Sequence, residues 1–137
     1  MARPINTIYA REDYLGADEY IDVVRKSGLN RPIEDRGRVE RMLAHANLIL
    51  TARQDGRLVG FARSLTDFCF CCYLSDLAVD KACQGQGVGK RLIEETRKAA
   101  GGELTTTLLL SAPTAMTFYQ GIKMPAADNC FLHRRTK

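Results

Sequence analysis

The sequence predicts a single α/β domain that spans residues 1–137. The length is that of one ordinary domain, with enough residues to bury a core. The composition, 45% apolar and 26% charged, is typical of a globular chain and unlike that of a disordered one. Apolar residues at helical spacing alternate along the chain with short strand-like runs, which is the pattern of an α/β fold.

The first elements are a strand and two amphipathic helices. Residues 5–10 are expected to form the strand, and apolar residues then recur at helical spacing over 17–24, with Gly28 to end that helix. A second apolar stripe over 39–46 predicts another helix. Each stripe needs a partner surface, so both helices are expected to lie on a sheet.

A hairpin and a third strand follow. Residues 47–53 and 57–65 are two β-like runs joined through Asp55-Gly56, a pair that favours a tight turn between antiparallel strands. The third run extends from about residue 69 to 79. Strict alternation along this strand places one set of side chains on one face, namely Leu74, Asp76 and Ala78, and the other set on the opposite face, namely Tyr73, Ser75, Leu77 and Val79.

The last third of the chain is expected to hold two helices and two strands. A stripe over 88–100 predicts a helix that ends at Gly101-Gly102, and residues 104–112 predict a buried strand. Pro113 suits the first turn of a helix that runs to about Tyr119. Residues 129–135 are expected to form a closing strand.

Residues 84–90, QGQGVGK, lie between the third strand and the following helix. Backbone N–H groups of a glycine-rich turn and a helix N-terminus together favour an anion such as phosphate. A Walker loop would need glycine in place of Gln84 and a hydroxyl residue in place of Arg91, and a dinucleotide fingerprint would need its third glycine in place of Lys90. The loop therefore matches neither of these nucleotide-binding motifs. A ligand-free tight turn is the structural alternative.

The loop and its surroundings resemble the GNAT superfamily of acetyl-CoA dependent N-acetyltransferases. The pyrophosphate loop of that family follows the pattern [Gln/Arg]-x-x-Gly-x-[Gly/Ala]. Gln84, Gly87 and Gly89 match its three defined positions. The preceding LSDLAVD and the downstream FYQGIKM, similar to the family's FYxxxGF, extend the resemblance over residues 73–124. Lys123 and Met124 depart from the family's glycine and phenylalanine.

The resemblance implies a twisted, mixed but mostly antiparallel sheet with helices on both faces and a splay between the fourth and fifth strands. It implies acetyl-CoA as cosubstrate, with no metal. The residues that it assigns to coenzyme binding are Leu77, Ala78 and Val79, by pairing with pantetheine, and Gln84, Gly85, Gln86, Gly87, Val88, Gly89 and Lys90, at the pyrophosphate.

The resemblance also implies direct transfer of acetyl to a primary amine, without a covalent enzyme intermediate. Tyr119 matches the family's tyrosine near the coenzyme sulfur and is the expected general acid, with core packing as its alternative role. Asp76 is the candidate base, or equally a structural carboxylate. Glu34, Asp35 and the C-terminal carboxylate stay open as other bases.

The cysteines and histidines do not suggest a metal site. Cys71 and Cys72 are neighbours on one strand and point to opposite faces, and the chain has only two histidines. We expect five reduced thiols, with Cys83 an exposed thiol near a helix N-terminus.

A net charge of +4 without a basic run or interleaved aromatics does not favour nucleic-acid binding. The N-terminus lacks a signal-peptide pattern and no apolar run is long enough to span a membrane, so a cytoplasmic protein is expected. The preferred acceptor is a small-molecule amine, and a homodimer is an option. The alternatives are a protein lysine or N-terminal acetyltransferase and a non-catalytic acyl-CoA sensor.

Overall fold

The computed structural model describes residues 6–137, so Ile5, the first residue of the expected opening strand, lies outside it. The strands are β1 (Thr7–Arg11), β2 (Leu48–Gln54), β3 (Arg57–Thr66), β4 (Cys71–Val79) and β5 (Thr106–Leu108). The helices are α1 (Ala17–Ser27), α2 (Arg36–His45), α3 (Val88–Ala99) and α4 (Met116–Gly121), with short 3-10 turns at Lys81–Cys83, Gly102–Leu104 and Pro113–Ala115.

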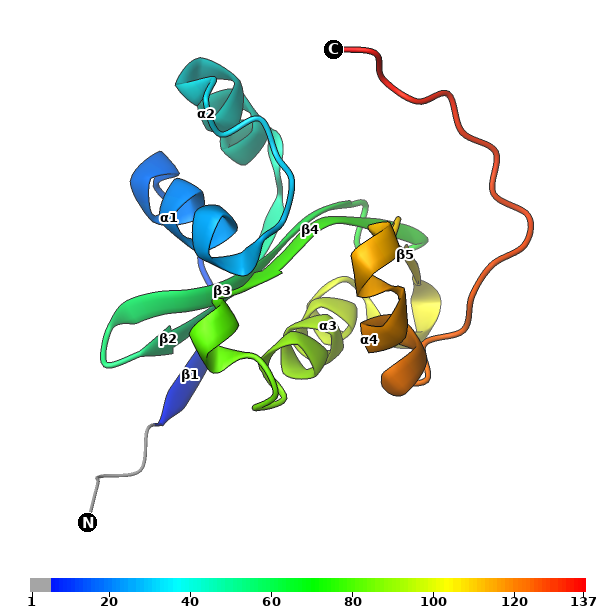
Figure 1. Cartoon of the computed structure of the whole chain (residues 1–137). Coiled ribbons are helices and arrows are strands. Elements are labelled where there is room, and N and C mark those ends of the chain that lie inside the picture. Colours follow the sequence, from blue (N-terminus) through cyan, green and yellow to red (C-terminus); the bar gives the residue numbers. More distant parts are fainter. Residues whose placement is uncertain (1–5) are drawn as a thin grey trace.

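The strands form one sheet in the order β1-β2-β3-β4-β5. The first four are antiparallel neighbours, and β5 runs parallel to β4. Helices α1 and α2 cover one face of the sheet and α3 covers the other (Figure 1). The expected mixed, mostly antiparallel sheet with helices on both faces is therefore confirmed.

The residues that predict a helix end and a tight turn from the sequence adopt those conformations in the structure. Gly28 ends α1 in a left-handed conformation, with φ of 81°. Asp55 and Gly56 both have positive φ, 49° and 79°, and join β2 to β3 as the tight turn predicted for an Asp-Gly pair.

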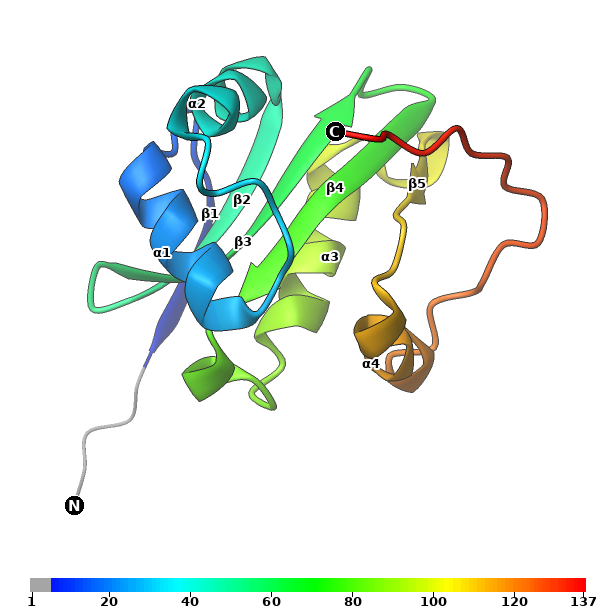
Figure 2. The same cartoon turned by 45° about the horizontal axis from the view of Figure 1, so that its top comes forward.

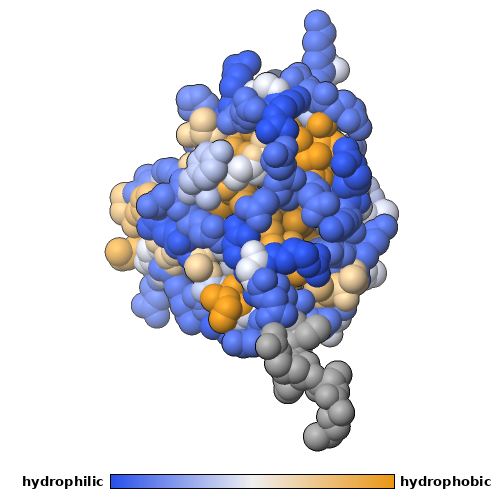
Figure 3. All heavy atoms as spheres, turned by 90° about the vertical axis from the view of Figure 1, so that its left-hand side faces the viewer, coloured by the Kyte–Doolittle hydropathy of each residue, from blue (hydrophilic) through white to orange (hydrophobic). Residues whose placement is uncertain are grey.

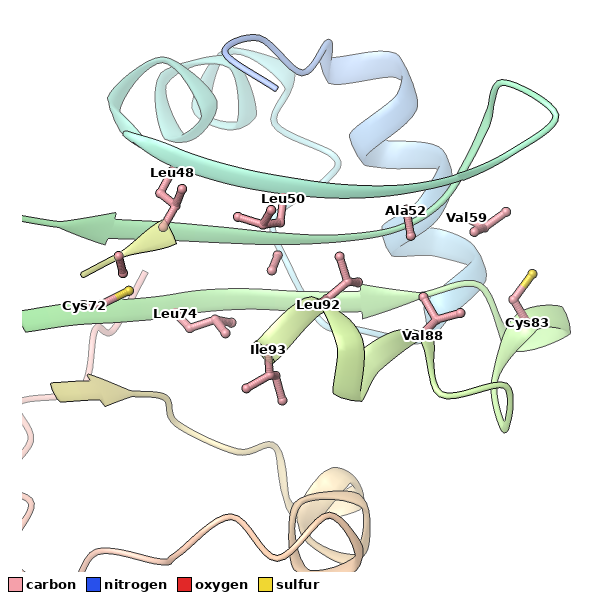
Figure 4. Close-up of a cluster of buried hydrophobic side chains, with 12 residues drawn as sticks. Leu48, Leu50, Ala52, Val59, Cys72, Leu74, Cys83, Val88, Leu92 and Ile93 are labelled. Atoms are coloured by element: carbon pink, nitrogen blue, oxygen red, sulfur yellow. The ribbon is translucent and has the colours of Figure 1, made fainter. Parts of the chain in front are cut away.

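The sheet separates two apolar cores. Side chains of β2, β3 and β4 pack against Val88, Leu92 and Ile93 of α3 on one face (Figure 4). On the other face, Tyr20 and Val24 of α1 pack with residues of α2 and the sheet. The apolar helix faces predicted from the sequence are the faces that the structure buries.

The expected strict alternation along β4 is wrong, because the strand contains a bulge. Asp76 pairs with Arg63 and Leu74 with the next residue of β3, which leaves Ser75 without an opposite residue. The extra residue reverses the facing of the strand at that point. Leu74 consequently lies in the core on the α3 side, whereas Ala78 lies in the core on the α1 side.

The C-terminal part also differs from expectation. The strand expected over 104–112 forms only over Thr106–Leu108 and is not buried. The strand expected over 129–135 is absent, and these residues are exposed and without regular structure. After α4 the chain runs as an extended segment around the outside of the domain (Figure 1). Strand-like composition does not make a strand where the segment pairs with no strand of the sheet.

Within residues 6–137, no helix combines the length and the apolar character needed to cross a membrane. On the side of the molecule that carries α1 and α2, hydrophilic side chains predominate and apolar ones form small separate patches (Figure 3).

Candidate active site

The loop between β4 and α3 leaves its backbone open to a ligand. Gly85 and Gly87 have φ of 83° and 79°, a conformation that favours glycine. A Cβ at either position would meet no atom within 4 Å, so the glycines border open space. Gln84 steadies the start of the loop, since its Nε2 donates to the Val79 carbonyl at 3.0 Å.

The N-terminus of α3 presents unpaired donors beside this loop. The first helical hydrogen bond runs from the Arg91 N–H to the Gly87 carbonyl, at 3.0 Å. The N–H groups of Val88, Gly89 and Lys90 therefore have no acceptor within the helix. Together with the helix dipole they make a site that suits a phosphate group.

Gly89 has a second role in packing. A Cβ at Gly89 would lie 2.9 Å from Cζ of Phe118, so the missing side chain lets α4 approach α3. The same residue thus offers an N–H to the candidate anion site and sets the position of α4 through its lack of a side chain.

Strand β4 has a free edge next to the loop. β5 pairs only with Cys71–Tyr73, so Leu74–Val79 lack a strand partner on that side. Figure 2 shows that β5 meets β4 at one end only, after which the chain diverges toward α4. This is the expected splay between the fourth and fifth strands.

The direction of the free backbone groups follows from one hydrogen bond. The Asp80 N–H donates to the Val59 carbonyl of β3 at 2.8 Å. Because backbone groups alternate along a strand, those of Ala78 also face β3, and those of Leu77 and Val79 face the splay. Of the three residues expected to pair with pantetheine, Leu77 therefore presents its N–H and C=O groups to the opening. Val79 presents its N–H, since its carbonyl already accepts from Gln84 Nε2.

Tyr119 lies on α4, where it is half-buried against the α3-side core. Burial raises the pKa of its phenol, and the positive charge of Arg31 acts in the opposite direction. Within residues 6–137 the hydroxyl has no hydrogen-bond partner. Tyr119 therefore keeps its proton at neutral pH and has it available to donate.

Asp76 lies at the centre of a buried polar cluster. Its fully buried carboxylate accepts hydrogen bonds from Tyr20 Oη at 2.7 Å, Arg31 Nε at 2.6 Å and Arg63 Nε at 2.5 Å. Burial alone would raise the pKa of Asp76, but the hydrogen bonds and charges of Arg63 and Arg31 outweigh it and lower the pKa. The carboxylate is thus ionised and a weak proton acceptor.

Arg31 joins the α1–α2 loop to β4, and the sequence did not single it out as a site residue. Besides the bond to Asp76, its Nη2 donates to the Ser75 carbonyl and its Nη1 to the Asn30 carbonyl, both at 2.6 Å. Arg31 and Asp76 are 45 positions apart in the chain, and no spacing pattern links them. Only the packing of the loop against the strand brings them together.

Cys83 is buried, so the expectation of an exposed thiol there is wrong. Its sulfur lies 3.6 Å from Oε1 of Gln54, as a donor to that amide. Cys71 is exposed and Cys72 buried, as their alternation predicted. In the described part of the chain, no three His, Cys, Asp or Glu side chains gather in a way that could hold a metal ion.

The sequence profile of the acetyltransferase (GNAT) domain matches residues 25–122. The chain belongs to this family. An uncharacterized N-acetyltransferase, ycf52, of Porphyra purpurea is 32% identical over 100 residues, which cover 67% of this chain and 54% of that protein. The chain therefore spans about half the length of this curated GNAT relative.

Solved structures share the GNAT fold. A probable acetyltransferase of unknown function from Staphylococcus aureus, SA2161, superposes with a TM-score of 0.77 at 20% identity, over 96% of this chain and 99% of that one. The aminoglycoside N-acetyltransferase AAC(6')-Iy, in complex with CoA, superposes with a TM-score of 0.73 at 14% identity, over 100% and 99% of the two chains.

The departure from the GNAT FYxxxGF segment leaves the turn intact. Lys123 stands at the glycine position and has φ of 61°, the left-handed conformation that glycine adopts readily. The Met124 N–H donates to the Tyr119 carbonyl and the Lys123 N–H to the Gln120 carbonyl, which is the bonding pattern of a Schellman cap. Lysine thus adopts the backbone conformation of the residue it replaces.

Proposed function

We propose that this GNAT domain transfers an acetyl group from acetyl-CoA to the primary amine of a small molecule, by direct transfer in a ternary complex. The observation that carries the proposal is that two stretches of backbone with free hydrogen-bonding groups lie next to each other. The open loop at Gly85 and Gly87, with the free N–H groups of α3, lies next to the free edge of β4. A coenzyme with a pyrophosphate and an amide-bearing arm matches both surfaces.

The chain's own groups account for coenzyme binding. The N–H groups at the start of α3 are donors for the pyrophosphate oxygens, and the left-handed glycines allow close approach. The outward N–H and C=O of Leu77 and the outward N–H of Val79 extend β4 by pairing with the amides of the arm. Acetyl-CoA supplies an activated acetyl group as a thioester.

Tyr119 is the proposed general acid. The neutral amine nitrogen attacks the thioester carbonyl carbon, a C–N bond forms, and the C–S bond breaks. Tyr119 donates its phenolic proton to the departing sulfur, and the proton lost by the amine returns through water to the phenolate. The raised pKa of Tyr119 supports this assignment, because the phenol stays protonated until thiolate charge develops.

The surroundings of Asp76 support a positioning role rather than that of a general base. A base must reach its proton directly or through water, and Asp76 is fully buried with three donors on its two oxygens. We propose that Asp76 holds Arg31 in place and that water receives the proton of the amine.

The coenzyme site is tested with Gly87→Val. A side chain at the left-handed Gly87 strains the loop and fills the space that a phosphate would take, so the affinity for CoA is expected to fall about tenfold or more, as measured by calorimetry. Gly102→Val is the matched control, because Gly102 also has positive φ and open space around its Cβ but lies after α3. Unchanged affinity in folded Gly87→Val would contradict the site.

The chemistry is tested with Tyr119→Phe, assayed by release of free CoA thiol with a panel of amines. We expect kcat to fall by about 10²–10⁴-fold, with unchanged affinity for CoA, because the proton is needed only as the thiolate forms. Tyr14→Phe, at a tyrosine that is 80% exposed, is the control. A chain that binds acetyl-CoA but transfers acetyl to no amine and no protein would be a sensor instead.

A further inference from the structure

The Asp76 cluster leaves one positive charge at the free edge of β4. Two guanidinium groups, those of Arg31 and Arg63, share the single carboxylate of Asp76. Tyr20, the other partner, stays neutral because burial and the charge of Asp76 raise its pKa. The Arg63 side chain is only 8% exposed and that of Arg31 24%, so solvent and ligands meet the excess charge at Arg31.

Arg31 still has donors to offer. A guanidinium carries five N–H groups, and three of those of Arg31 are used, for Asp76, Asn30 and the Ser75 carbonyl. Two N–H groups on the terminal nitrogens are left for a ligand. The three bonds hold the guanidinium rigidly, so a ligand that binds it does not have to order a mobile side chain.

Arg31 lies at the opposite end of the free edge from the glycine-rich loop at 84–90, the proposed pyrophosphate site. It contacts Ser75, whereas the loop follows Val79, and four residues of strand at about 3.3 Å each separate the two by about 13 Å. The pyrophosphate is therefore not the ligand of Arg31. The charge of Arg31 does act on Tyr119, which places it within electrostatic reach of the proposed proton donor.

The carboxylates of the same loop do not neutralise Arg31. Asp35 accepts the Arg38 N–H at 3.0 Å and caps α2, and Glu34 is exposed. A polyamine would bring further ammonium groups toward a fixed cation, which is unfavourable. A carboxylate on the acceptor would find a charge and two donors in place.

We propose that Arg31 is a specificity-determining residue that binds a carboxylate of the acceptor, so that the acceptor is a small amine carrying a carboxylate, of the amino-acid type. This proposal rests on the proposed acetyl transfer to an amine. The amine reacts near Tyr119 while the carboxylate pairs with the two remaining N–H groups of Arg31.

The test compares matched acceptors that differ only in the carboxylate: L-lysine with cadaverine, and L-phenylalanine with phenethylamine. Thiol release from acetyl-CoA is measured at equal concentrations of free amine, and kcat/KM is determined for each. The wild-type kcat/KM is expected to be at least about tenfold higher for the carboxylate-bearing member of each pair, because its carboxylate forms charge-assisted hydrogen bonds with Arg31. A ratio of one or less, with measurable transfer, overturns the role of Arg31 and leaves the proposed function standing.

Variants at Arg31 test whether this residue causes the preference for a carboxylate. Arg31→Met is expected to reduce the ratio to about one through loss of carboxylate binding, and Arg31→Lys, which keeps the charge, is expected to restore part of it. Arg36→Met is the matched control, because Arg36 is an exposed arginine paired with Asp18 and Glu40 outside the site, and it should keep the wild-type ratio. An unchanged ratio in folded Arg31→Met and Arg31→Lys contradicts the proposal. Absence of transfer to any amine, with acetyl-CoA bound, overturns both proposals.

Discussion

Residues 6–100 and residues 101–137 differ sharply in burial. Every buried residue in the described chain lies in the first region, and none lies in the second. Large exposed apolar side chains gather in the second region: Leu104, Leu108, Leu110, Met116, Phe118, Phe131 and Leu132. The first region therefore supplies the stability of the fold, whereas the second is held by few contacts.

The groups of the proposed chemistry are divided between the well-buried first region and the second region, which has no buried residues. The glycine-rich loop at 84–90, the free edge of β4 and the Arg31–Asp76 cluster all belong to the first region. Tyr119 belongs to the second and reaches the site because Phe118 packs over Gly89 and Tyr119 itself packs against the α3-side core. The binding surfaces thus lie on the well-buried part of the chain and the proposed proton donor on a part without buried residues, where lower local stability is expected.

The largest effect on stability is expected from Asp76→Asn. Removal of the carboxylate charge leaves the buried Arg63 uncompensated, and breaking a buried ion pair in this way costs about 3–5 kcal/mol. Urea unfolding measures the change. Asp128→Asn, at an exposed residue of the second region, should have no comparable effect. A small loss in Asp76→Asn would mean that water reaches the cluster.

The same variant has a pH signature. The pKa of Asp76 is lowered in the folded state, so its carboxylate stabilises the fold at pH above its unfolded value of about 3.9, and this contribution is lost as pH falls through the folded pKa. Unfolding of Asp76→Asn should therefore depend less on pH below about 4 than that of the wild type.

The pH dependence of the rate of acetyl transfer tests the proposed role of Asp76 in catalysis. If folded Asp76→Asn keeps the wild-type pH–rate profile, water rather than Asp76 receives the amine proton. A flattened profile would assign the base role to Asp76.

A pair of leucine substitutions compares the two regions directly. Leu92 of α3 is fully buried, and Leu92→Ala is expected to lower the free energy of unfolding by about 2–5 kcal/mol through lost burial and a cavity. Leu132 is 46% exposed in the extended tail, and Leu132→Ala should change it by less than about 0.5 kcal/mol. Equal losses in urea unfolding would show that the tail packs against the domain in solution.

The smallest effect is expected from Lys123→Gly at the end of α4. A non-glycine residue in the left-handed conformation costs about 1–2 kcal/mol, and glycine removes that strain but loses more entropy on folding. We expect a gain below about 1 kcal/mol in thermal or urea unfolding, at the one turn that carries Tyr119 into place. A clear loss would show that Lys123 makes a stabilising contact in solution.

Local signals predicted the elements of the first region well, because they act over a few residues. Gly28 and the Asp55-Gly56 pair adopt the backbone conformations that their chemistry favours, and the helical stripe of α3 is the buried one. The errors lie where long-range pairing decides. The bulge at Ser75 depends on the register between β3 and β4, and whether 129–135 pairs with the sheet depends on the path of the chain after α4, which runs around the outside of the domain (Figure 1).

By itself the sequence determined the α/β class, the glycine loop before α3 and the tyrosine of the FYQGIKM segment, since each is encoded in residues close together in the chain. Only the tertiary structure decided which charges meet. The cluster of Tyr20, Arg31, Arg63 and Asp76 joins α1, a loop and two strands, and its members show no common spacing. Burial of that carboxylate requires donors from every side, and such donors are brought together by packing of the helices on the sheet rather than by sequence neighbours.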